Sequence, residues 1–210
     1  MRTPLMLAML LFSLQAAPCR ADSDSLFTVG LGTAMGVNRS TPLGGTPEAT
    51  FTTELSVKLK ALHVFGVEFS YAPTDPAESQ SAIVFDGPFR LSGLLYLVPT
   101  YPVTFYVKGG IGAGDIEDLV KIDGASNSYH GGAGLDVHIG ENLVIGAEYL
   151  LLIPGVAGVK STLSMFANDE IKRYQARDPN QPFDSGAPPE VADFISADNF
   201  RVTLSARWYF

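Results

Sequence analysis

The residues of this chain best suited to chemistry are Ser128 and His130. In an extended segment the side chains of residues i and i+2 lie on the same face. The hydroxyl and the imidazole can therefore approach each other as a nucleophile and its general base. Asp136 and His138 repeat the spacing, whereas His63 lies in a short segment that predicts a turn. The elements that carry these groups, and the face they project from, decide whether any of them forms a site.

Those elements show a period of two. In residues 200–210 apolar side chains alternate with polar ones that include Arg201 and Arg207. Successive side chains of a strand point to opposite faces, so this alternation predicts strands with one apolar and one polar face. The predicted strands are residues 26–37, 50–61, 64–71, 89–97, 103–114, 128–139, 143–153 and 200–210.

The connections between these segments alternate in length. Short ones lie at residues 62–63, 99–102 and 140–142, and long ones at 38–49, 72–88, 115–127 and 154–199. Short turns on one rim and long loops on the other are typical of an up-and-down barrel. The last loop, at about 154–198, includes a predicted amphipathic helix at 162–177, which could cap the barrel, lie on the membrane or bind a partner.

The composition limits the class of protein. Hydrophobic residues make up 46% and charged residues 17%, with a net charge of −8. The acidic balance argues against nucleic acid as a partner, and the apolar content argues against disorder. One cysteine excludes a disulfide framework or a cysteine-based zinc site. Neither a metal site nor a cofactor is predicted, because the acidic groups Asp115-x-Glu117-Asp118 and Asp169-Glu170 do not follow the EF-hand pattern and are better explained as a solvated surface.

The polar face of the strands holds few charges of nearly balanced sign, and many Gly, Ser and Thr residues. That composition suits a crowded lumen, and aromatic residues near the strand ends suit membrane interfaces. The fold class predicted is therefore all-β, an eight-stranded antiparallel up-and-down transmembrane β-barrel. A soluble barrel with an apolar interior is the alternative. The lumen charge network is predicted to comprise Glu54, Lys58, Glu68, Arg90, Lys108, Asp136, His138, Glu148, Arg201 and Arg207.

The first residues predict export. A positive start, an apolar run of about ten residues and small residues before Asp22 form a signal peptide at 1–21, with cleavage after Ala21. A lipid-modified Cys19 is the weaker alternative, because Pro18 precedes it. The mature chain, 22–210, is then a single barrel domain.

The last strand carries a family resemblance. Its end, Thr203-x-Ser205-x-x-Trp208-x-Phe210, resembles the C-terminal assembly signal of Gram-negative outer-membrane proteins, with Ser205 in place of the usual glycine. The mature chain as a whole is similar to the small outer-membrane β-barrels of the OmpA-domain, OmpX and OmpW type. The resemblance implies the cell outer membrane as location. It also implies a monomer that contacts lipid, lipopolysaccharide and the outer-membrane assembly machinery.

This resemblance does not imply one activity, because such barrels include anchors, adhesins, narrow channels and lipid-modifying enzymes. An eight-stranded lumen is just wide enough for its own side chains. We therefore expect a plugged barrel that anchors and displays its loops, in adhesion or envelope integrity. A narrow channel for small solutes or ions is the alternative. A lipid A-modifying enzyme is less favoured, because Ser128 and His130 would face the lumen and a lipid substrate lies outside.

Overall fold

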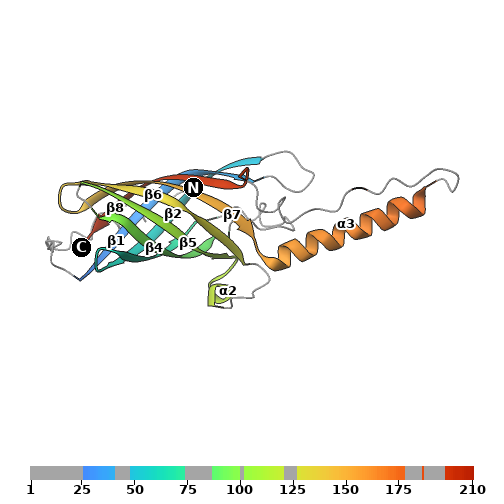
Figure 1. The fold of residues 1–210 in the computed structure, drawn as a ribbon, viewed down its shortest axis with the longest axis horizontal. Coiled ribbons are helices and arrows are strands. Elements are labelled where there is room, and N and C mark those ends of the chain that lie inside the picture. The colour runs from blue at the N-terminus through green and yellow to red at the C-terminus, as the bar shows by residue number, and fades with distance from the viewer. Residues whose placement is uncertain are drawn as a thin grey trace, which may run out of the picture.

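In a computed structural model, which describes residues 26–40, 48–73, 87–99, 102–120, 127–177, 186 and 197–210, the chain forms one closed barrel (Figure 1). Every neighbouring pair of strands is antiparallel, in the order of the sequence, and β1 pairs with β8. The predicted eight-stranded up-and-down barrel is confirmed. Its strands are β1 (Phe27–Ser40), β2 (Glu48–Ala61), β3 (Phe65–Tyr71), β4 (Phe89–Pro99), β5 (Val103–Ala113), β6 (Ser128–Ile139), β7 (Leu143–Pro154) and β8 (Phe200–Tyr209).

The short connections gather at one rim, called here the short-turn rim. Leu62 and His63 turn the chain between β2 and β3 with φ of 52° and 58°, and the Leu62 N–H donates to the Leu26 carbonyl over 2.9 Å. Gly140, with φ of 69°, lies in the turn between β6 and β7. The Phe210 N–H donates to the Val29 carbonyl, so β8 ends at this rim beside the start of β1. The opposite rim is the long-loop rim.

Burial alternates along the strands as the period-two pattern predicts. The apolar residues of β8, such as Val202, Leu204 and Trp208, are 41–58% exposed, while the alternate residues are 7% exposed or less. Among the outward positions of the eight strands, Arg39 near the long-loop end of β1 is the single charged residue. The apolar face therefore looks outward and the polar face lines the lumen.

At the long-loop rim, two helices lie within the residues that the structure describes. The five-residue α2 (Ile116–Val120) was not predicted. The other, α3 (Val156–Ala176), begins six residues before the predicted helix and runs away from the barrel roughly along its long axis (Figure 1). Leu163, Ile171 and Tyr174 are 41–54% exposed on it. Within the described parts of the chain, no helix has both the length and the apolar composition to cross a bilayer.

The predicted signal peptide, 1–21, lies outside the described residues, as do parts of the long loops. Its cleavage stays a prediction.

Candidate functional site

The lumen holds nine buried Asp, Glu, Lys and Arg side chains, each 6% exposed or less. Five are bases and four are carboxylates, so the group carries one net positive charge. All of β2 to β8 contribute, whereas β1 presents only the small residues Gly30, Gly32, Ala34 and Gly36 to the interior along this stretch. The nine are Glu54, Lys58, Glu68, Arg90, Lys108, Asp136, Glu148, Arg201 and Arg207.

Glu68 on β3 is the centre of the larger cluster. Its Oε1 lies 2.7 Å from Lys108 Nζ. Its Oε2 lies 3.3 Å from Lys58 Nζ and 3.3 Å from an Arg207 terminal nitrogen. One fully buried carboxylate thus pairs with three bases on β2, β5 and β8.

Two more carboxylates complete this cluster. Glu148 Oε1 lies 2.9 Å from Lys108 Nζ, and its Oε2 accepts a hydrogen bond from the Tyr106 hydroxyl at 3.0 Å. Asp136 lies 3.4 Å from Lys58 Nζ and 3.3 Å from Arg207. Each base of the cluster therefore contacts two carboxylates, and the cluster joins six of the eight strands.

A smaller cluster lies nearer the long-loop rim. Glu54 on β2 pairs with Arg90 on β4 and with a terminal nitrogen of Arg201 on β8, the latter at 2.6 Å. Arg90 Nε also donates to Ser70 Oγ over 3.3 Å. Two arginines share one carboxylate here, whereas the larger cluster has three bases and three carboxylates. The net positive charge of the nine residues therefore lies in the half of the lumen towards the long-loop rim.

Pairing explains how so many charges are buried together. An isolated charge transferred from water to a low-dielectric interior costs several kcal/mol or more, and good ion-pair geometry is needed to offset that cost. All nine residues have a partner of opposite charge. The side chains that a lumen of this size must hold are thus mutually neutralising, apart from one positive charge.

Of the ten residues predicted for the lumen charge network, nine are the buried charged residues described above. The tenth, His138, is half-buried near the short-turn rim, and its Nε2 lies 3.1 Å from Thr104 Oγ1. Lys60, two residues after Lys58 on the same face of β2, is also half-buried, with its Nζ 4.4 Å from the centre of the Tyr96 ring. The prediction did not include Tyr106 as a partner, although its ring is fully buried in the lumen, with its centre 5.6 Å from that of the Tyr96 ring at a tilt of 59°.

The catalytic candidates occupy a different arrangement from the one predicted. His130 Nε2 lies 2.8 Å from Ser92 Oγ on β4, and Ser128 makes no hydrogen bond to His130 among the residues that the structure places. Ser92 is 2% exposed and His130 6% exposed, both on the lumen face. A serine nucleophile needs its substrate within contact distance. This pair is closed off from a lipid outside the barrel, and its geometry suits packing rather than acyl transfer.

The four residues of the predicted assembly signal divide between the two faces. Thr203 and Ser205 face the lumen at 3% and 7% exposure, and Trp208 projects outward at 51%. Phe210 follows the end of β8. Their role in assembly stays a prediction.

Metal ligation finds no support in the described ranges, where no group of three or more His, Cys, Asp or Glu side chains is placed to hold an ion. The arrangement as a whole can pair and neutralise charge, and can tie strands together across the lumen.

No protein-family model matches the chain. No curated protein sequence matches it either. Among solved structures, the crystal structure of Neisserial surface protein A (NspA) is similar, with 11% sequence identity, a TM-score of 0.41, and coverage of 88% of this chain and 96% of that chain. An identity this low does not indicate what this chain does.

Proposed function

We propose that this protein is an integral barrel of the Gram-negative outer membrane whose plugged lumen makes it an anchor and whose long-loop rim displays surface segments. The observation that carries the proposal is the opposite polarity of the two faces. The outward positions carry no charged residue except Arg39, and the nine charged residues of the lumen are buried and paired. A soluble barrel would have the reverse arrangement.

Aromatic residues on the outer face support the membrane location. Near the long-loop rim the ring centres of Tyr71 and Phe89 are 4.9 Å apart, and those of Tyr149 and Phe200 are 5.5 Å apart. Near the short-turn rim Phe27, Phe65 and Trp208 are 51–62% exposed. Two aromatic belts that flank an apolar band are the pattern that membrane barrels present to lipid interfaces.

The displayed element is α3. At about 1.5 Å per residue, its 21 residues extend about 30 Å from the rim. Its C-terminal half carries exposed apolar and charged groups, including Ile171, Tyr174 and the Lys172–Asp169 pair, which is 71–76% exposed. Such a helix suits contact with a surface or a partner, in adhesion or in envelope integrity, better than closure of the barrel mouth.

The proposed contacts follow from this location. The outer face contacts outer-membrane lipid, the long-loop rim contacts lipopolysaccharide, and the C-terminal strand contacts the assembly machinery during insertion. The protein is proposed to act as a monomer. It is proposed not to be an enzyme, because the buried pair of Ser92 and His130 has no access to lipid.

Purified barrel reconstituted in planar bilayers is expected to show no steady conductance, because paired side chains occupy the lumen. The measurement is single-channel current in symmetric salt, with the heat-unfolded protein as the blank. Heat-modifiable mobility on gels confirms that the sample is folded. A stable, ion-selective open state would contradict the plugged lumen and support the narrow channel instead.

Deletion of residues 160–190 is expected to leave insertion and heat-modifiable mobility unchanged, because it removes no residue of β1 to β8. The same deletion is expected to abolish binding of cells that express the protein to host cells or matrix. The matched control replaces Asp118 with Asn in α2 at the same rim, which leaves α3 in place and is expected to bind as the wild type does. Binding that survives the deletion would show that α3 is not the displayed element.

A further inference from the structure

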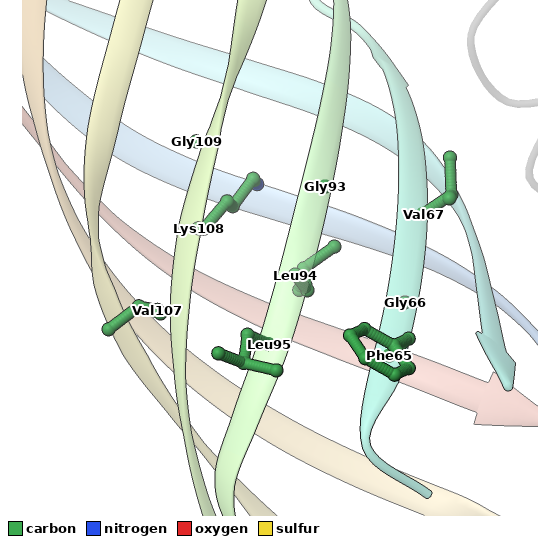
Figure 2. A pocket seen from close by; sticks show the side chains of 9 residues that line it. All are labelled: Phe65, Gly66, Val67, Gly93, Leu94, Leu95, Val107, Lys108 and Gly109. Atoms are coloured by element: carbon green, nitrogen blue, oxygen red, sulfur yellow. The ribbon is translucent and has the colours of Figure 1, made fainter. Parts of the chain in front are cut away.

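The outer wall of the barrel carries an open apolar groove of about 500 Å³ across β3, β4 and β5 (Figure 2). Its outward residues are Phe65, Val67, Gly93, Leu95, Val107 and Gly109. Gly93 and Gly109 are direct partners on neighbouring strands, and they form the floor. Phe65, Val67, Leu95 and Val107, each 39–56% exposed, form the sides.

The barrel itself does not need glycine on this floor. A Cβ built on Gly93 would meet only the Gly109 carbonyl oxygen, at 3.9 Å, and a Cβ on Gly109 only the His130 carbonyl oxygen, at 3.8 Å. Glycine in the interior of a strand costs about 0.5–1 kcal/mol relative to alanine. The two glycines thus lower the stability of the barrel, and no contact within the described chain requires them. This points to an occupant of the groove outside the barrel.

The lining restricts what the occupant can be. No outward side chain of the groove is polar, and the backbone groups of its strands are paired in the β3–β4 and β4–β5 ladders. A headgroup or a peptide would therefore find no hydrogen-bonding partner here. A second copy of the chain would need at least about 1,000 Å² of buried surface for a stable interface, far more than six outward residues on three strands provide.

The position of the groove selects one leaflet. Phe65 is the first residue of β3, beside the short-turn rim, whereas Gly93 and Gly109 lie near the middle of β4 and β5. Phe65, Leu95 and Val107 are paired in one row and Val67, Gly93 and Gly109 in the next, so the groove extends about 7 Å along the strands. Both rows lie between the short-turn rim and the middle of the apolar band, within the depth reached by an acyl chain anchored in the leaflet at the short-turn rim.

We propose that this groove holds one acyl chain of a phospholipid from the periplasmic leaflet. The inference rests on the proposed outer-membrane orientation, with the short-turn rim towards the periplasm. Lipid tails are as apolar as the wall, so the chain is held by van der Waals contact with the groove and not by the hydrophobic effect. An acyl chain that lies over Gly93 and Gly109 contacts the sheet more closely than it would over larger side chains.

The test uses native mass spectrometry of the full chain, folded in vesicles of phosphatidylethanolamine and phosphatidylglycerol and extracted in mild detergent. The wild type is expected to retain one phospholipid per monomer. The double variant Gly93→Val/Gly109→Val fills the floor, and its ratio of lipid-bound to lipid-free protein is expected to fall about tenfold, which corresponds to about 1.4 kcal/mol.

Gly131→Val is the matched control. Gly131 is the partner of Gly109 on β6, its built Cβ meets only the Lys108 carbonyl oxygen at 3.9 Å, and it lies outside the groove. This variant is expected to retain lipid as the wild type does. Phe65→Ala, which lowers one side of the groove without adding bulk to a strand, is a second variant expected to lose lipid. Heat-modifiable mobility establishes that each variant is folded.

Equal retention in the wild type and in both groove variants would overturn the proposal. So would a dimer without lipid, or preferential retention of lipid A when lipid A and phospholipid are supplied in equal amounts. A wild type that does not insert into vesicles would overturn the proposed function as well. Insertion without retained lipid would overturn the groove proposal alone.

Discussion

Replacement of Glu68 by Gln is expected to lower the free energy of unfolding by about 3–5 kcal/mol, the usual cost of removing one partner from a buried ion pair. The amide keeps the size of the side chain and removes its charge. Lys58, Lys108 and Arg207 each lose a carboxylate partner, in a lumen that already has more bases than carboxylates. The excess rises from one positive charge to two, with nothing in the cluster to compensate.

The measurement is urea unfolding of the barrel in phospholipid vesicles, followed by the fluorescence of Trp208, the single tryptophan of the chain. Asp169→Asn is the matched control, because it removes a carboxylate from an ion pair that is 71–76% exposed. Exposed pairs contribute about 0–1 kcal/mol, so the control should unfold almost as the wild type does. A Glu68→Gln barrel within 1 kcal/mol of the wild type would show that the lumen cluster does not hold the barrel together.

Replacement of Gly132 by Ala is expected to destabilise the barrel by about 3 kcal/mol or more, or to prevent its closure. A Cβ at this position on β6 would collide with the Tyr149 carbonyl oxygen and would lie 2.9 Å from the Leu150 Cα of β7. Both obstacles are backbone atoms of a paired strand, so neither can rotate away as a side chain would.

The adjacent residue provides the control. Gly131→Ala adds the same methyl group one residue earlier on the same strand, where the nearest atom is 3.9 Å away. We expect it to change the free energy of unfolding by less than about 0.5 kcal/mol. The comparison is the folded fraction of each variant by heat-modifiable mobility after refolding in vesicles. Equal folded fractions would mean that the backbone of β7 moves aside to accommodate the methyl group at residue 132.

The sequence was sufficient to predict the barrel because the alternation of apolar and polar side chains is a local property, and it is present in every strand. Predicted and observed strands agree to within three residues at each end, with β1 extended to Ser40 by its pairing with β2 and β8. The same alternation separated lumen residues from outward residues along each strand. Strand position alone therefore predicts that Glu54, Glu68 and Arg207 face the lumen, independently of the contacts between them.

Contacts across the lumen were harder to predict, because they depend on how far each strand is displaced along its neighbour. The sequence spacing suggested that Ser128 would meet His130, whereas the pairing of strands brings Ser92 to it. It also gave no sign that Tyr106 would reach Glu148. The early start of α3 was missed because Val156, Gly158 and Val159 have weak helix propensity.

The absence of large inner side chains on β1 has a consequence for how the barrel assembles. The carboxylates that pair with Arg201 and Arg207 lie on β2, β3 and β6, none of which is a hydrogen-bonding neighbour of β8. Asp136 reaches Arg207 over Gly146 of β7, but an open sheet cannot bring Glu54 and Glu68 to β8. The last strand of the chain therefore gains its ion pairs with Glu54 and Glu68 only when it meets the first, where the inner face of β1 leaves room for its long side chains. Closure of the barrel and neutralisation of these charges therefore occur together. Intermediates in which β1 and β8 are not yet paired are disfavoured, and we expect the barrel to fold and unfold in a single cooperative step.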